Sequence, residues 1–367
     1  MRAVLLLLIP AVAAADPAFV PEKAVVVGRV GSGAWTDAPT EARSDQQAEL
    51  GAVVIGRRGR KRVVLAPPEV TAVKLGGARV KTEPLAAKVQ WSTVEPHGFR
   101  ATPAKNGVTS NFYSNVSVDP PAFGKWRGYD TIDYFEHVFA PWSTTAIIPA
   151  KIAASEPNAT QVPGLGTIRF KVEVEIEGVR VRSPGAEATD TAGMLPSVHR
   201  VSIRRGDDFL GRLSSYLLVP EVFGSAGVGR THQTDRFTGA DCADVMVGAM
   251  RRAGRQLAYT NVAGLTAYAR PVSKLIRLDD KGMPETPVAV KAGDLIRIDY
   301  GVDSPRPSWD HVAALWEDRS DPAGPHKGGP DGKLDGFDLV IHMGHPRLVI
   351  EPLARQAPAT IDVLRWR

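Results

Sequence analysis

The sequence predicts an α+β protein, in which a helix carrying a thiol packs on an antiparallel sheet behind a mainly β region. Short apolar runs separated by Gly, Pro and basic turns dominate the first half. Residues 167–176 alternate between apolar and charged side chains, which is typical of a half-buried antiparallel strand. In the second half, 242–252 has helical periodicity and apolar strand patterns follow from 294 to 364. One helix on an antiparallel sheet is an α+β arrangement.

Composition excludes several classes of protein. The chain has 367 residues, of which 43% are hydrophobic and 23% charged, so it is globular rather than disordered and long enough for two domains. The formal net charge of +5 suits an anionic surface such as a cell wall. We expect no nucleic-acid partner, because the chain contains no nucleic-acid-binding motif and is expected to be exported.

The N-terminus resembles a secretory signal peptide. Met1-Arg2 is a short positive start, Val4 to Val12 is too short to span a membrane, and Ala13-Ala14-Ala15 offers a small-residue cleavage site. We therefore expect a signal peptide over 1–15 and a secreted or periplasmic protein. No cysteine follows the apolar stretch, so we expect no lipid anchor, and no second long apolar run predicts an integral membrane segment.

Two features of the first half leave alternatives open. The basic run 57–62 lies between two apolar runs, and this position favours a solvated hairpin tip over a binding site. An aromatic segment follows, which forms either a sugar-stacking surface or, more commonly, the core under a long loop. Its members are Phe123, Trp126, Tyr129, Tyr134, Phe135, Phe139 and Trp142.

Cys242 is the only cysteine, and the sequence places it in the first turn of a helix. Asp241 is a good N-cap, Asp244 can complete an arrangement like a capping box, and Gly254 is a normal C-terminal stop. Unpaired N–H groups and the helix macrodipole stabilise a thiolate at such a position, which makes Cys242 a candidate nucleophile. The alternative is a small buried hydrophobic residue. An unpaired thiol in an exported chain favours the nucleophile.

Two histidines are candidate partners for the thiol. His311 opens one predicted strand, 311–317, and His342 closes another, 338–342. If these strands pair, both imidazoles lie at the same end of the sheet, where the start of the Cys242 helix could dock. A nucleophile needs a base within hydrogen-bond reach, and the base needs an orienting group. The composition of the intervening loop, 318–336, predicts an exposed surface insertion.

Four sequence blocks resemble the NlpC-type papain-like cell-wall peptidases. They are Asp241-Cys242-Ala243-Asp244, Ala292-Gly293-Asp294-Leu295-Ile296, His311-Val312-Ala313-Ala314-Leu315 and Val340-Ile341-His342. The resemblance implies a papain-like catalytic domain over 205–367, behind a mainly β region of unknown role over 16–204. It implies Cys242 as nucleophile, His311 as base and His342 as orienter, with no metal and no cofactor. The implied activity is hydrolysis of amide or peptide bonds, in the stem peptides of peptidoglycan or in another amide substrate.

The chain departs from this family pattern at two places. Glu221 stands where the family often has a Tyr that polarises the carbonyl, and a carboxylate cannot donate that hydrogen bond. Ala243-Asp244 replaces the usual Ser-Gly after the nucleophile. A non-catalytic cell-wall or glycan-binding protein with a degenerate papain-like domain is therefore the alternative. A metal site is a weaker rival, because its candidate ligands lack zinc or calcium spacing. These ligands are His326, His342, His345, Asp331, Asp335 and Asp338.

Overall fold

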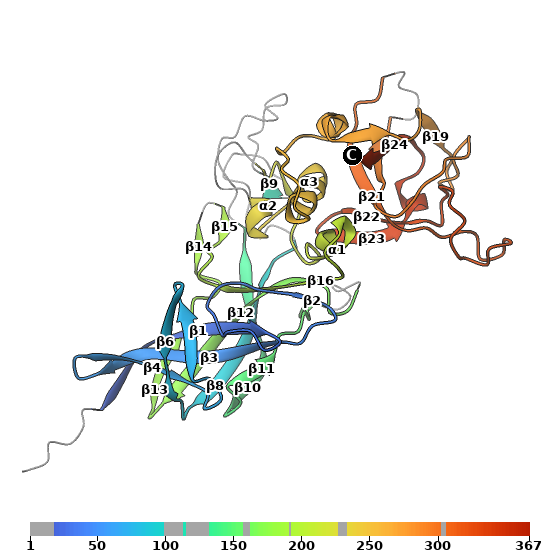
Figure 1. The fold of residues 1–367 in the computed structure, drawn as a ribbon. Coiled ribbons are helices and arrows are strands. Elements are labelled where there is room, and N and C mark those ends of the chain that lie inside the picture. The colour runs from blue at the N-terminus through green and yellow to red at the C-terminus, as the bar shows by residue number, and fades with distance from the viewer. Residues whose placement is uncertain are drawn as a thin grey trace, which may run out of the picture.

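The computed structural model of the chain describes residues 18–98, 113–114, 132–156, 162–190, 192–226, 233–301 and 306–367. Strands dominate these ranges, and the helices are short. Figure 1 shows the strands of the first half at one end of an elongated molecule, the helices in the middle and a second group of strands at the other end. The predicted signal peptide, 1–15, lies outside the described residues, as do Phe123, Trp126 and Tyr129.

The first half is built from two larger sheets and small hairpins. The first sheet contains β1 (Phe19–Val30), β3 (Ala48–Arg58), β4 (Lys61–Ala66), β7 (Glu83–Pro84) and β11 (Ile147–Pro149). The second sheet contains β10 (Tyr134–Ser143), β8 (Lys88–Pro96), β12 (Gly166–Ile176), β13 (Val179–Arg182), β16 (His199–Arg204) and β2 (Thr40–Arg43). The short pairs are β5 (Ala72–Leu75) with β6 (Ala78–Lys81), β14 (Thr189–Asp190) with β15 (Gly193–Met194), and β9 (Tyr113–Ser114) with β17 (Val222–Phe223).

The two sheets pack on each other through a shared core. Leu50 of the first sheet and Trp91 and Phe170 of the second are buried in one hydrophobic cluster. The alternating strand predicted at 167–176 is β12, which pairs with β8 on one edge. The basic run is the tip of the β3–β4 hairpin, as predicted: Arg58 pairs with Lys61, and Gly59 has a φ of +63° in the turn between them.

The helices connect the two groups of strands. They are α1 (Phe209–Ser214), α2 (Gln233–Arg236) and α3 (Cys242–Arg252), with 3₁₀ turns η1 (Ala263–Ala267) and η2 (Leu353–Gln356). Helix α3 begins and ends as predicted. The Asp241 carboxylate accepts a hydrogen bond from the backbone N–H of Asp244 at 2.8 Å, and Gly254 follows the helix with a φ of +98°.

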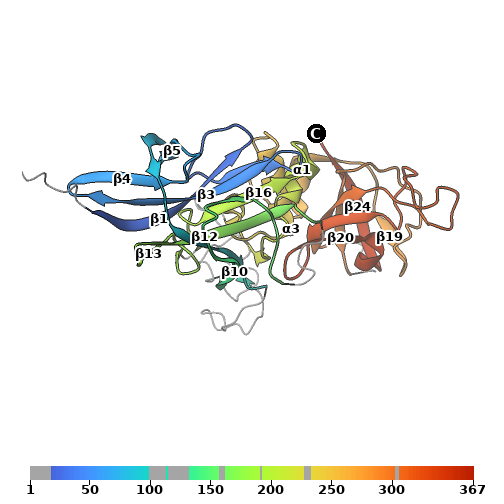
Figure 2. The same ribbon diagram turned by 90° about the horizontal axis from the view of Figure 1, so that it is seen from below.

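The second half contains a seven-stranded antiparallel sheet, called here the C-terminal sheet. In order, its strands are β18 (Ala269–Pro271), β24 (Ala359–Trp366), β20 (Leu295–Asp299), β21 (His311–Glu317), β22 (Leu339–Met343) and β23 (Leu348–Pro352), and β19 (Ile276–Leu278) also pairs with β24. The strands predicted to carry the two histidines are neighbours, since Ala313 of β21 is opposite His342 of β22. Figure 2 shows α3 against one side of this sheet.

The predicted α+β class, with its papain-like C-terminal domain, is wrong. The described residues form a mainly β fold of several sheets, with three α-helices of 6, 4 and 11 residues. The reason is that the strands of the C-terminal sheet are buried on both faces. Ala314 packs toward the cluster that contains α1 and α3, whereas its neighbour Ala313 packs into a second core. Loops and η2 cover that second face, so most of the added structure is not helical.

The loop 318–336 differs from the expected surface insertion. The Leu334 side chain is 2% exposed and packs in the second core. Its backbone N–H donates to the carbonyl of Val288 at 2.9 Å. The Asp318 carboxylate accepts hydrogen bonds from the N–H groups of Asp331 and Gly332 at 3.0 and 2.9 Å. The end of the loop is therefore part of the cover over the C-terminal sheet.

Replacement of Leu334 by Ala should therefore destabilise the protein. Loss of a buried leucine side chain leaves a cavity and costs about 2–5 kcal/mol in the free energy of unfolding. Urea unfolding measures this change, with Lys327→Ala on the exposed part of the same loop as the control. A Leu334→Ala variant as stable as the control would mean that the loop is a dispensable insertion.

His199 is a buried histidine that the fold keeps neutral. His199 is the first residue of β16, and 5% of its surface is exposed. Its Nε2 lies 2.9 Å from the hydroxyl of Thr40, the first residue of β2. Burial, and secondarily the nearby Arg200 guanidinium, lower the pKa of His199 to about 4. Below pH 6.5 the unfolded chain therefore binds a proton that the folded chain does not. Stability is lost as pH falls from 6.5 toward 4.

The variant His199→Gln should reduce this acid sensitivity. Glutamine does not titrate and still offers an amide to Thr40. The wild type should lose more stability than the variant between pH 7 and 4, by up to about 3 kcal/mol for this shift in pKa. Urea unfolding at several pH values measures the difference, with His326→Gln at an exposed position as the control. Parallel pH profiles for wild type and variant would show that His199 is not held neutral.

Candidate active site

Cys242 is the first residue of α3 and lines a cavity of about 240 Å³. The side chain is partly exposed. Phe223, Asn261, Trp309 and Asp310 are among the other residues around this cavity. The backbone N–H of Val312, the second residue of β21, is near enough to the sulfur to act on the pKa of the thiol. The helix start thus docks against the beginning of the strand that His311 opens.

The two predicted histidines are in direct contact. His311 Nε2 and His342 Nδ1 are 2.9 Å apart. Their rings are perpendicular, with centroids separated by 4.9 Å. Pairing of β21 with β22 produces this contact, because it places the two side chains at the same end of the C-terminal sheet. An imidazole held by a second imidazole is the arrangement expected for a base and its orienting group.

Among the described residues, no hydrogen bond or other contact joins Cys242 to His311. The backbone of Val312, the residue after His311, acts to lower the pKa of the thiol. Successive side chains of a strand point to opposite faces, and Val312 packs in the cluster that contains α3, so this proximity does not bring the imidazole of His311 to the sulfur. The structure therefore joins His311 to His342, and among the described residues no contact joins Cys242 to either histidine.

Three further residues extend the histidine pair, and no sequence pattern had indicated them. His342 Nε2 is 3.1 Å from the Glu351 carboxylate, which also accepts a hydrogen bond from the Gln356 amide at 2.7 Å. The Tyr300 hydroxyl donates to the other end of that amide, and its ring stacks beside His311 at 6.4 Å between centroids. These residues come from β23, from η2 and from the position directly after β20, so only the folded sheet brings them together.

This network assigns the protons on both imidazoles. Hydrogen bonds from His342 and Gln356 keep the pKa of Glu351 below its usual value, with the His342 bond as the largest cause, so Glu351 is an ionised acceptor. A neutral His342 then carries its proton on Nε2, and its Nδ1 accepts a hydrogen bond from His311 Nε2. Gln356 Nε2 and His342 Nε2 are 3.2 Å apart because both donate to the same carboxylate, that of Glu351. The remaining nitrogen of His311, Nδ1, is left with a free lone pair.

The charge state of the thiol differs from the sequence-based expectation. Burial raises the pKa of Cys242, and the adjacent Asp241 carboxylate raises it further. Burial, with the neighbouring His342 as a second cause, lowers the pKa of His311 to about 3. Near neutral pH the resting pair is therefore a neutral thiol and a neutral imidazole. The carboxyl groups at the start of α3 oppose the stabilisation of a thiolate that a helix N-terminus normally gives.

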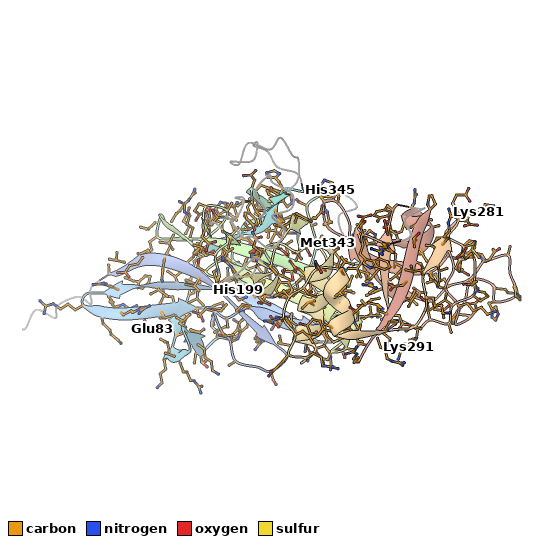
Figure 3. The ribbon with its side chains drawn as sticks, turned by 90° about the horizontal axis from the view of Figure 1, so that it is seen from above. Glu83, His199, Lys281, Lys291, Met343 and His345 are labelled. Carbon is orange, nitrogen blue, oxygen red and sulfur yellow. The ribbon has the colours of Figure 1, made fainter. Side chains whose placement is uncertain are left out.

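Carboxyl groups gather near the start of α3, where the thiol lies. Asp241 accepts a hydrogen bond from the Gly224 N–H at 3.1 Å, and Asp244 accepts one from the Ser225 hydroxyl at 2.7 Å. Burial raises the pKa of each aspartate. Glu221 lies 2.7 Å from Nδ1 of His345. Figure 3 shows His345 and Met343 beside the junction between the helices and the C-terminal sheet.

The structure also places the candidate ligands of the rival metal site. Among the described residues, no group of three or more His, Cys, Asp or Glu side chains could hold a metal ion. Of the proposed ligands, His342 and His345 are engaged with Glu351 and Glu221 respectively. Within the described ranges no helix is long and apolar enough to cross a membrane.

Comparison with known proteins found no matching family model, curated protein or solved structure.

The variant Asp241→Asn should make the thiol more reactive near neutral pH. Asparagine caps a helix as well as aspartate does, so α3 should remain, whereas the loss of a negative charge lowers the pKa of Cys242. The rate of alkylation by iodoacetamide between pH 7 and 9 measures the change. Asp235→Asn, which alters an exposed carboxylate bonded to Tyr259, is the matched control. Equal rates in both variants would show that burial alone sets the thiol pKa.

Proposed function

We propose that the chain is a cysteine hydrolase that cleaves an amide bond, with Cys242 as nucleophile, His311 as base and His342 as orienter. The contact between His311 Nε2 and His342 Nδ1 at 2.9 Å supports this assignment most directly, and the thiol at the start of α3 is the candidate nucleophile. A nucleophile, a base and an orienting group together are the requirement for acyl transfer.

The first step of this reaction moves one proton and forms one bond. The Cys242 proton passes to Nδ1 of His311, and the sulfur bonds to the amide carbon. The tetrahedral intermediate then expels the amine, which takes the proton from His311, and leaves a thioester. Water attacks the thioester with His311 again as base and releases the acid. The backbone N–H of Cys242 at the helix start is a candidate oxyanion donor.

Glu351 and Gln356 have a positioning role in this proposal. Once His311 accepts the thiol proton it becomes an imidazolium, and His342 Nδ1 accepts a hydrogen bond from it. Because Glu351 is ionised and holds the Nε2 proton of His342, the pair keeps this polarity throughout the reaction. The neutral resting state means that the ion pair forms only as the thiol attacks. The free-energy cost of separating the two charges therefore falls in the chemical step.

The substrate class and the location rest on the sequence. The order of the four blocks supports peptide bonds of peptidoglycan stem peptides as substrates, and the apolar stretch behind Met1-Arg2 supports export through a signal peptide. The net charge of +5 is favourable for approach to an anionic cell wall. Glu221 is bonded to His345 and is an acceptor, so it does not replace the tyrosine that the family pattern uses.

A non-catalytic cell-wall or glycan-binding protein is the second candidate. It is favoured by one observation: the thiol has a raised pKa, and among the described residues no contact joins it to His311. A thiol in this state alkylates slowly near neutral pH whether or not it is catalytic. Thiol reactivity of the wild type therefore does not distinguish the two functions, and hydrolysis must be measured directly.

Single substitutions at the three residues should separate the two functions. Cys242→Ala should abolish release of peptide fragments from purified peptidoglycan, while thermal stability changes little because Ala is tolerated at a helix start. His311→Ala should lower turnover by about 10²–10⁴-fold, the usual contribution of a positioned base. His342→Ala should be milder, since the base remains but is poorly oriented.

The double variant Cys242→Ala/His311→Ala should be no worse than Cys242→Ala alone, because the residues act as a unit. His326→Ala, at an exposed position of the 318–336 loop, is the control and should keep wild-type turnover. Wild-type fragment release by Cys242→Ala would refute the thiol mechanism. Absence of hydrolysis in the wild type, with retained binding to the cell wall, would favour the binding protein.

A further inference from the structure

The proposed hydrolysis needs a second hydrogen-bond donor beside the thiol. When the Cys242 sulfur bonds to the amide carbon, an electron pair moves onto the carbonyl oxygen, and this oxyanion is stabilised by N–H groups fixed around it. The backbone N–H of Cys242 is one such group, because the first N–H groups of a helix have no intrahelical partner and none is present for this one in the described ranges. Glu221 is an acceptor bonded to His345, so another residue must be the second donor.

Three uncharged side chains other than the thiol line the cavity of about 240 Å³ and carry donor groups. They are Asn261, Ser308 and Trp309. The Ser308 hydroxyl already donates to the Asp310 carboxylate at 3.2 Å. The Trp309 ring lies against the Arg297 guanidinium, which is 4.1 Å from its centroid. The amide of Asn261 and the indole N–H of Trp309 therefore remain as candidate donors.

The amide of Asn261 has a fixed orientation. Its Oδ1 accepts a hydrogen bond from the backbone N–H of Gly264 at 2.9 Å, and only the oxygen end of an amide can accept. This bond assigns Nδ2 as the end that remains available. Nδ2 carries two N–H groups and bonds to none of the residues that the structure describes. Asn261 therefore offers the cavity a donor and no acceptor.

The segment that carries Asn261 is anchored to the C-terminal sheet. Arg297 of β20 forms a buried ion pair with Asp362 of β24, in which Nε and Oδ1 are 2.9 Å apart. Its Nη1 donates to the carbonyl of Ala263 at 3.3 Å, at the start of η1 and two residues after Asn261. The same guanidinium supports the ring of Trp309. One buried cation thus fixes two walls of the cavity, which is the preorganisation that an oxyanion donor requires.

The wall that carries Trp309 is held in an uncommon backbone conformation. Trp309 has a φ of +55°, in the left-handed region that bulky residues rarely adopt. The Asp299 carboxylate accepts a hydrogen bond from the Ser308 N–H at 2.9 Å, and the Asp310 carboxylate accepts one from the Tyr300 N–H at 3.0 Å. Both neighbours of Trp309 are therefore tied to the end of β20. Strained residues that are held by their surroundings cluster at functional sites.

We propose that Asn261 is a catalytic residue of this hydrolase and that its Nδ2–H donates to the oxyanion together with the backbone N–H of Cys242. The inference rests on the proposed function and adds the donor that Glu221 does not supply. The two N–H groups stabilise the negative oxygen while the tetrahedral intermediate exists. The electron pair re-forms the carbonyl when the C–N bond breaks and the amine leaves with the proton from His311. A neutral amide suits this role, because the Asp241 carboxylate beside the thiol opposes negative charge there.

The variant Asn261→Asp removes the donor and keeps the acceptor. Its carboxylate still accepts from the Gly264 N–H, so thermal stability should be retained. The turnover number on a soluble stem peptide of peptidoglycan should fall by about 10²–10³-fold or more, the usual cost of removing one oxyanion donor. Asn261→Ala adds no charge and should lower the turnover number by a similar factor with little change in KM, because the bond forms only in the transition state.

Thr266→Ala is the matched control. Thr266 is an exposed residue of η1 whose hydroxyl bonds to the carbonyl of Ala263, and it does not line the cavity. This variant should keep wild-type turnover. A loss of turnover in Thr266→Ala as large as in Asn261→Ala would mean that any disturbance of η1 inactivates the protein, and it would overturn a direct role for the Asn261 amide.

Alkylation of Cys242 by iodoacetamide separates an oxyanion donor from a residue that supports the nucleophile. Displacement of iodide by the sulfur forms no oxyanion. Asn261→Ala should therefore be alkylated at the wild-type rate, although its hydrolysis is strongly reduced. An alkylation rate that falls together with the turnover number would place Asn261 in support of the thiol and would overturn the proposal.

The remaining contrary results are distinguishable from one another. Wild-type turnover in both Asn261 variants, with Cys242→Ala inactive, would exclude Asn261 and leave the hydrolase mechanism in place. A loss confined to Trp309→Phe, which removes the indole N–H and keeps a ring, would assign the donor to Trp309. Absence of hydrolysis by the wild type would refute the proposed function and the oxyanion role with it.

Discussion

Helix α3 is buried along almost its whole length, and this burial holds the two groups of strands together. Every residue from Ala243 to Met250 is buried. The cluster that encloses them includes Trp91 of the second sheet and Val312 of the C-terminal sheet. Each large apolar side chain removed from water contributes about 1.5–3 kcal/mol, so the helix has no alternative position of similar stability. The start of α3 is consequently fixed against the first residues of β21, and that contact defines where the thiol lies.

The same burial determines the electrostatics of the candidate active site. A helix start enclosed by protein is shielded from water, and Asp241 and Asp244 occupy it as the cap and the first-turn acid. The Asp241 carboxylate accepts a hydrogen bond from the backbone N–H of Asp244, which is one of the free donors at the helix start that would otherwise stabilise a thiolate. The cap that specifies the helix therefore works against ionisation of its first side chain. A neutral nucleophile is the consequence of a well-formed helix terminus.

The sequence was informative wherever a local pattern decides the structure. The bounds of α3 followed from Asp241 and Gly254, and the contact of His311 with His342 followed from two strand patterns with a histidine at matching ends. The fold class was not predicted correctly, because the cover on the second face of the C-terminal sheet depends on burial of residues such as Leu334, which sits in a polar loop. Glu351 reaches His342 only through pairing of β22 with β23, and no spacing in the sequence encodes that contact.

The place of β24 has a consequence for how the chain is made. β24 lies inside the C-terminal sheet, between β20 and the short strands β18 and β19, although it comes some 60 residues after β20 in the sequence. Similarly, β2 pairs with β16, which is synthesised about 160 residues later. Pairings over such distances form slowly, because a long loop must close before any contact repays the lost entropy. During synthesis the edges of β20 and β2 wait unpaired until their partners emerge, so assembly of each sheet is delayed well beyond translation of its first strands. This delay leaves the chain open for longer, which is a favourable property for passage through a translocation channel and an unfavourable one for resistance to aggregation.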